Sequence, residues 1–168
     1  NSYEHSVQNC ALGIAFGRHI GLNKRELSTL ATGLLLMDIG KVKLPRELLT
    51  KETPHTKAET EIMRRHVAFT VDILKQTAGI SEHVINIALT HHERYDGSGY
   101  PNGLVGTQTP VYGRIAAIID CYDSMITSMV APGCMGSAPG PVPQAIRSPG
   151  SSSMKAPNSA VRTTRPDW

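Results

Sequence analysis

The chain has 168 residues, 40% of them hydrophobic, and a formal net charge of +3. This length supports one domain with a hydrophobic core, and because no run approaches the roughly 18 apolar residues of a membrane helix, we expect no membrane insertion. Residues 131–168 hold four of the 17 basic residues and one of the 14 acidic ones, so the remainder balances at 13 of each sign and offers no basic face for a nucleic-acid polymer.

The cysteines and the first residue indicate the setting of the chain. Cys10, Cys121 and Cys134 lie far apart and form no paired motif. An odd, sparse set of cysteines favours reduced thiols and a cytoplasmic location. The sequence begins with Asn1 and shows no basic segment followed by an apolar one, so we expect no secretion signal and interpret the chain as a domain truncated at both ends.

Apolar residues recur at helical spacing along most of the first 130 residues, and no segment alternates as a strand would. Capping boxes mark two helix starts, Asn23 with Glu26 and Thr56 with Glu59. These patterns predict an all-α fold, a bundle of about five helices. The expected helices cover residues 3–20, 23–39, 56–77, 81–93 and 111–127, with a loop at 41–45 and a short helical turn at 45–49.

The composition changes after about Val130. Of the 38 residues from 131 to 168, 17 are glycine, proline or serine, and glutamate is absent. Such a segment cannot bury enough apolar surface to offset the entropy that ordering would cost. The sequence therefore predicts a domain at residues 1–129, followed by a low-complexity, disordered tail at 130–168.

Three polar side chains lie on helix faces that are otherwise apolar. Asp38 follows three leucines and a methionine, and a buried carboxylate needs a partner because burying it alone is very costly. His66 shares a face with Ile62 and Phe69, and Asp120 sits among alanines and isoleucines. Each alone has a plainer interpretation: a salt bridge or helix-end hydrogen bond for Asp38, and a hydrogen-bonded core histidine for His66.

Together with the histidines at the start of the chain and in the middle of it, these residues suggest one site. They come from five successive helices, and a bundle can bring one inward residue per helix to a common centre, as carboxylate-bridged dimetal proteins do. Mixed imidazole and carboxylate ligands suit iron or manganese most, with zinc and nickel as alternatives. The predicted ligands of this two-metal centre are His5, Asp38, His66, His91, His92 and Asp120.

The most specific motif of the chain runs from His91 to Pro101 and reads His-His-Glu-Arg-Tyr-Asp-Gly-Ser-Gly-Tyr-Pro. A second motif, Asp-Ile-Gly-Lys-Val, begins at Asp38 and is followed by a Leu-Pro pair. With these motifs the chain resembles, over about residues 3–128, the HD-GYP family of metal-dependent phosphodiesterases. The resemblance implies an HD-type helical bundle.

The resemblance also implies a hydrolase that converts cyclic di-GMP to linear pGpG and then GMP. Asp38 is expected to bridge two divalent metals that activate a water molecule. Lys41 is expected to neutralise charge on the phosphoryl oxygens, although a solvated loop lysine is the plainer interpretation. The resemblance assigns contacts with the substrate to Lys41, Tyr100, Arg114 and Asp123.

The loop of Gly99, Tyr100 and Pro101 is expected to shape the pocket and to contact partner proteins, here signalling proteins of the diguanylate cyclase type. Its plainer interpretation is an ordinary rigid turn. A homodimer is a further expectation.

The chain departs from the family pattern at three places. Met37 stands where the family has a metal-binding histidine, and a thioether is a poor ligand for hard divalent metals, so we expect weaker metal loading. Asn1 replaces the glutamate of members with a third metal, and residues 129–132 lack the family's basic residues that grip phosphate. Reduced activity is therefore expected, and the alternatives are a catalytically inactive regulator that binds nucleotide or signalling partners, and a phosphohydrolase acting on another nucleotide.

Overall fold

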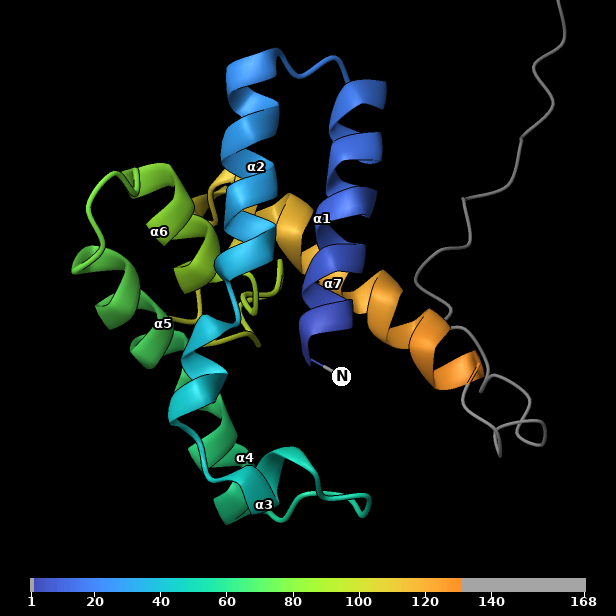
Figure 1. The fold of residues 1–168 in the computed structure, drawn as a ribbon, viewed down its shortest axis with the longest axis vertical. Helices are drawn as coiled ribbons and strands as arrows, with labels where there is room; N and C mark the ends of the chain where they lie inside the picture. Colours follow the sequence, from blue (N-terminus) through green and yellow to red (C-terminus); the bar gives the residue numbers. More distant parts are fainter. Residues whose placement is uncertain (1, 131–168) are drawn as a thin grey trace, which may run out of the picture. The chain divides into compact units, whose positions relative to one another are not determined.

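The computed structural model describes residues 2–130, and within this range every regular element is a helix (Figure 1). This confirms the all-α prediction, whereas the predicted disordered tail lies outside the described residues. None of the helices within residues 2–130 combines the length and the apolar character needed to cross a bilayer. The α-helices are α1 (Ser2–His19), α2 (Lys24–Leu36), α3 (Arg46–Leu49), α4 (Lys57–Arg64), α5 (His66–Lys75), α6 (Glu82–Thr90) and α7 (Val111–Val130), and the 3-10 helices are η1 (Ile39–Lys43) and η2 (Gly106–Gln108).

Both predicted capping boxes are present. The Asn23 side chain accepts hydrogen bonds from backbone N–H groups of the first turn of α2, and Glu26 Oε2 accepts one from Asn23 N at 2.8 Å. Thr56 and Glu59 make the same reciprocal pair at the start of α4. Such caps contribute about 1 kcal/mol each. Ser81 stands at the N-cap of α6, but its side chain makes no capping hydrogen bond.

The single helix expected over residues 56–77 is two helices in the structure. The chain turns at Arg65, whose N–H bonds to the carbonyl of Ile62 at 3.1 Å, three residues back instead of four. Beyond this turn, α5 packs against η1 and α6, and it buries four residues, whereas α4 buries none. The packing of α5 therefore sets the direction of the chain here, and His66 becomes the first residue of a helix whose inner face is buried.

The helix expected to run to Ile39 ends at Leu36, and the loop expected at 41–45 begins as η1. Gly40 explains this compact turn, because its backbone N–H donates to Thr70 Oγ1 at 2.9 Å and so joins η1 directly to α5. Asp38 lies at the start of this turn and is consequently held close to the beginning of α5.

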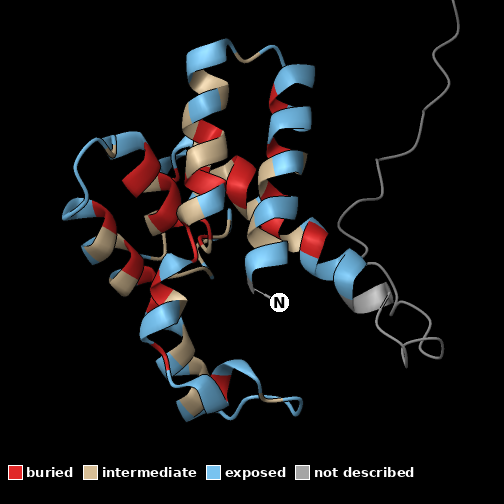
Figure 2. Ribbon diagram, viewed as in Figure 1, coloured by how far each residue is buried: buried red, intermediate tan, exposed pale blue. Residues whose placement is uncertain are grey.

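The hydrophobic core lies where α2, α5, α6 and α7 face one another. Figure 2 shows the buried residues concentrated on the inner sides of these helices. Burial of this apolar area is the main source of stability. The core cluster consists of Leu30, Leu34, Met37, Leu74, Val84, Ile85, Ile87, Ala88, Ile115, Ala116 and Ile119.

Gly40→Ala is expected to destabilise the fold by about 2–3 kcal/mol, because overpacked positions typically cost this much. A Cβ atom at Gly40 would collide with the backbone carbonyl of His66 and the backbone nitrogen of Thr70, neither of which can move independently. Urea unfolding measures the effect. Val42→Ala in the same 3-10 helix is the control: Val42 is 76% exposed, so its change should stay within about 0.5 kcal/mol. Equal stability of the two variants would contradict the close packing.

Candidate metal centre

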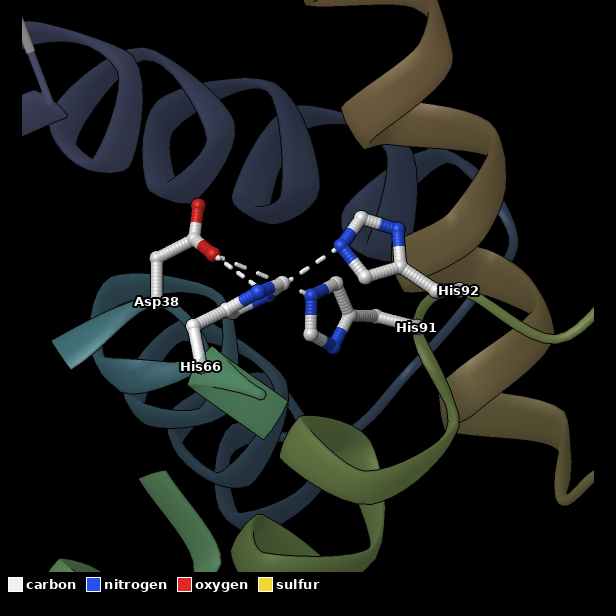
Figure 3. Close-up of side chains that lie close together, drawn as sticks. All are labelled: Asp38, His66, His91 and His92. Carbon is white, nitrogen blue, oxygen red and sulfur yellow. Dashed lines mark hydrogen bonds and ion pairs between the residues drawn. The ribbon is translucent and has the colours of Figure 1, made fainter. Parts of the chain in front are cut away.

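Four side chains from three parts of the chain converge at one end of the core. Figure 3 shows Asp38, which follows α2, facing the imidazoles of His66, His91 and His92. One nitrogen or carboxylate oxygen from each of the four lies within 4.8 Å of the others. We refer to these four residues as the histidine group.

A second group shares Asp38 with the first. It combines Asp38 with His5 of α1 and Asp120 of α7, again with ligand-type atoms within 4.8 Å of one another. We refer to it as the α1–α7 group. The six residues predicted as ligands from the sequence are thus brought together in two adjoining groups.

The backbone orients two of the imidazoles. His66 Nδ1 lies 2.7 Å from the carbonyl oxygen of Met63, and His91 Nδ1 lies 2.8 Å from that of Ala88. A carbonyl only accepts, so each Nδ1 carries a proton, and the neutral form of each ring has its lone pair on Nε2. The two Nε2 atoms point toward Asp38 Oδ1, at 3.2 Å for His66 and 3.9 Å for His91.

This arrangement of acceptors fits a bound cation. Within the described residues, Asp38 Oδ1 and His91 Nε2 are buried and have no hydrogen-bond partner. His92 Nε2 also lies only 3.2 Å from His66 Nε2. An unpartnered buried polar atom costs about 1–3 kcal/mol, and metal-ligating histidines characteristically donate their other ring N–H to a carbonyl or carboxylate. The donor set of imidazole nitrogens and carboxylate oxygen suits a divalent transition metal.

The protonation states favour the same interpretation. Burial is the main cause that lowers the pKa of both His91 and His92 well below the ordinary range of an imidazole. Burial opposes ionisation of Asp38, but a proton on His66 Nε2, when it is present in the metal-free site, and the ammonium group of Lys41 outweigh this and hold its pKa below the usual range. His91 and His92 are therefore neutral and Asp38 is anionic near pH 7, which are the forms that bind metals.

The α1–α7 group is tied together by hydrogen bonds. His5 Nε2 lies 2.9 Å from Asp120 Oδ1, and His5 Nδ1 bonds to Asp123 Oδ2. The bond with Asp120 raises the pKa of His5 most, burial opposes this, and the bond with Asp123 adds to the rise. Burial raises the pKa of Asp120, but the contact with His5 outweighs it, and the net shift is downward. In this structure His5 is paired with carboxylates, so a metal at this group would compete with a proton.

Lys41 lies beside the shared carboxylate. Its Nζ is 2.7 Å from Asp38 Oδ2, and a quarter of its side chain is exposed. Lys41 and Asp38 line an open groove of about 490 Å³ whose other walls include Tyr3, Ile39 and Val42. The two polar groups therefore sit where a ligand in this groove would meet the candidate metal centre.

The other residues predicted to bind substrate are placed differently. The Tyr100 ring stacks on His92, with ring centroids 4.7 Å apart and planes 25° apart. Asp123 is 4% exposed and is engaged by His5. Arg114 belongs to neither group and lines a separate groove of about 560 Å³ with Arg94. Their roles toward substrate stay predictions.

Sequence reasoning missed two residues of this region. Asn9 is fully buried, and its Nδ2 lies 3.1 Å from His5 Nε2; its position one helical turn after His5 was a usable signal. Glu93 is 2% exposed, and its carboxylate bonds to backbone N–H groups of the following loop. It directly follows the paired histidines, but nothing in the sequence shows which backbone groups it would meet.

Met37 is fully buried and belongs to the apolar core cluster. A thioether offers no nitrogen to the candidate centre, and the weaker metal loading expected from this residue stays a prediction. Asn1, Ala131 and Pro132, on which other departures from the family pattern depend, lie outside the described residues.

Comparisons with known proteins identify a family and several relatives that are similar to this chain. A family model described as HD domain matches residues 2–135. A protein of Pseudomonas aeruginosa named as a cyclic di-GMP phosphodiesterase is 37% identical over 124 residues, which cover 74% of this chain and 30% of that protein. One of Thermotoga maritima with the same activity in its name is 34% identical over 127 residues, 75% of this chain and 34% of its own length.

A third relative differs in its named substrate. The 3'3'-cGAMP-specific phosphodiesterase 2 of Vibrio cholerae is 39% identical over 121 residues, which cover 71% of this chain and 23% of that protein. The chain spans about a third or less of the length of these relatives.

Proposed function

The chain belongs to the HD domain family, and from this premise we propose that it hydrolyses cyclic di-GMP at a centre of two divalent metals. The observation that carries the proposal is the convergence of the histidine group on Asp38, with the lone pairs of two backbone-held imidazoles directed at an unpartnered carboxylate oxygen. Relatives at 34–37% identity are named for this activity, which supports the choice of substrate.

We assign the two metals, iron or manganese, to the two groups. His66, His91 and His92 would hold one, His5 and Asp120 would hold the other, and Asp38 would bridge them. When bound, such a pair lowers the pKa of a water molecule and places positive charge beside the phosphoryl oxygens.

The residues of the chain itself have distinct tasks in this proposal. The carbonyls of Met63 and Ala88 keep the Nε2 lone pairs of His66 and His91 on the metal side. Lys41 reaches the same groove as Asp38, where its ammonium group would pair with a non-bridging phosphate oxygen of the dinucleotide. The product would be linear pGpG and then GMP.

The proposal also covers the location of the chain, its protein partners and its domain boundary. We propose a cytoplasmic location, based on the sparse cysteines. Diguanylate cyclase-type proteins at the loop of Gly99, Tyr100 and Pro101, and a homodimer, remain part of the proposal. The boundary between a domain at 1–129 and a tail at 130–168 is proposed on composition alone.

The proposal is tested by incubating the chain with cyclic di-GMP and either Mn²⁺ or Fe²⁺ and separating the nucleotides. We expect pGpG to accumulate with metal, and to stop accumulating when EDTA is in excess. The same assay with 3'3'-cGAMP shows whether the substrate follows the Vibrio relative instead. Metal-supported turnover of neither dinucleotide would contradict the proposed function.

A catalytically inactive regulator is the second candidate, and Met37 favours it because a thioether replaces a nitrogen ligand beside Asp38. Metal content separates the two candidates. About two metals per chain with turnover supports the enzyme. Less than one metal per chain, with nucleotide binding and no turnover, supports the regulator.

A further inference from the structure

We propose that Glu93 is a positioning residue, which anchors the loop after the paired histidines and so holds the Tyr100 ring against the imidazole of His92. The inference rests on the proposed metal centre for its functional meaning. Its structural part stands on the contacts of Glu93 alone.

The Glu93 carboxylate is used entirely by the backbone of the loop. Its Oε1 accepts a hydrogen bond from Asn102 N at 2.8 Å, and its Oε2 accepts one from Leu104 N at 2.9 Å. None of the ion pairs found within residues 2–130 includes this carboxylate, although it is only 2% exposed. Charge-assisted bonds to N–H groups are stronger than neutral ones, and two of them fix both the position and the direction of the loop.

The loop also packs directly against the backbone of Glu93 at Gly99. A Cβ atom at Gly99 would overlap the backbone of Glu93 and Arg94, so only glycine lets the two segments approach this closely. Tyr100 N donates to the carbonyl of His92 at 3.2 Å. The position of Tyr100 is therefore fixed by the hydrogen bond of its own backbone nitrogen and by the two bonds that Glu93 accepts from the residues after it.

His92 needs such an external support because it lacks the one its neighbours have. His66 and His91 each bond through Nδ1 to a backbone carbonyl, but no hydrogen bond in the described part of the chain joins His92 to the backbone through its ring. The Tyr100 ring stacks on the imidazole at 4.7 Å, and Arg64 covers the Tyr100 ring at 4.8 Å.

The orientation of His92 matters because its ring faces both groups of candidate ligands. Nε2 lies 3.2 Å from His66 Nε2, and Nδ1 lies 3.9 Å from Asp120 Oδ2. A rotation of the ring would move both nitrogens at once. The chain of contacts therefore runs from the Glu93 carboxylate through the loop and Tyr100 to His92.

The test compares Glu93→Gln with Tyr100→Ala in the metal-free chain. In Glu93→Gln the amide NH₂ group cannot accept a hydrogen bond, so one of the two loop N–H groups loses its acceptor. We expect hydrogen exchange at the backbone amide of Asn102 or Leu104 to accelerate about tenfold or more. We also expect the NMR signals of the His92 ring to shift. Tyr100→Ala should shift the His92 signals and leave exchange at both amides close to wild type. Glu52→Gln, at an exposed position of the loop before α4, is the matched control and should change neither.

The functional test measures the affinity of each variant for Mn²⁺ by competition with a fluorescent chelator. Supporting residues of this kind typically change metal affinity by about 10- to 100-fold. We expect the affinity for Mn²⁺ to fall about tenfold in Glu93→Gln and in Tyr100→Ala, and to stay unchanged in Tyr100→Phe. The variant that combines Glu93→Gln with Tyr100→Ala should lose no more affinity than Tyr100→Ala alone, because Glu93 acts on His92 through Tyr100.

The outcomes separate this inference from the proposed function. Wild-type His92 signals in Glu93→Gln, or additive affinity losses in the double variant, would overturn the positioning role. If the wild-type chain binds no Mn²⁺, the metal centre is wrong, while the His92 signals still decide whether Glu93 orients that ring.

Discussion

Asp38→Asn is expected to lower metal affinity on the order of a hundredfold or more and to reduce hydrolysis of cyclic di-GMP to background. Asp38 is the one residue that both groups of candidate ligands share. Asparagine keeps the size of the side chain but removes its charge and one of its two acceptor oxygens. Neither metal would then have its anionic ligand, and the bridge between them would be lost.

The measurement is metal content by elemental analysis together with the nucleotide assay on the same preparation. Asp72→Asn, which changes an exposed carboxylate of α5, is the matched control and should keep both the metal and the activity. Retention of a full metal complement by Asp38→Asn would remove the basis for the bridging role. Loss of turnover with full metal content would limit Asp38 to a role in the reaction.

The general location of the site could be predicted because two kinds of signal coincide in the sequence. Asp38, His66 and Asp120 are polar residues on apolar helix faces, and such residues need partners when they are buried. The contiguous segment from His91 to Pro101 adds a motif whose composition is too unusual for a simple turn. The helices followed from apolar spacing and capping boxes, which are local properties.

The remaining geometry depends on contacts between distant segments. Apolar periodicity continues through Arg65, and no glycine or proline marks the turn there, so one helix was the natural expectation for residues 56–77. The turn arises because η1, through Gly40, packs on α5. This packing brings Asp38 to His66, and no local pattern contains that information.

Glu93 shows the same limit at the level of one side chain. A glutamate after two histidines resembles a further ligand or a solvated charge. The structure instead directs both of its oxygens at backbone N–H groups nine and eleven residues ahead. Every residue except proline carries a backbone N–H group, so the identity of the partner residue gives no signal in the sequence. This contact could therefore not be predicted from the sequence.

Met37→His is expected to raise metal affinity about tenfold or more, and to increase the metal content and the turnover with it. The side chain directly precedes Asp38 and is fully buried in the apolar cluster. An imidazole there would supply a nitrogen ligand in place of a thioether, which hard divalent metals bind poorly.

The substitution should have opposite effects on stability with and without metal. In the metal-free chain, a polar ring in the core with an unpartnered nitrogen costs about 1–3 kcal/mol, so urea should unfold Met37→His at a lower concentration than wild type. With saturating Mn²⁺, each tenfold gain in affinity returns about 1.4 kcal/mol. The deficit should therefore shrink or reverse as metal is added.

Met37→Leu separates the ligand effect from simple repacking. Leucine keeps the apolar volume and supplies no nitrogen, so metal loading and turnover should match wild type. Met37→His could stay folded and leave the metal content, the turnover and the metal dependence of unfolding unchanged. In that case residue 37 does not face the metals, and the reduced activity expected of this chain needs another cause. A gain that Met37→Leu reproduces would point to core packing, since leucine cannot bind the metal.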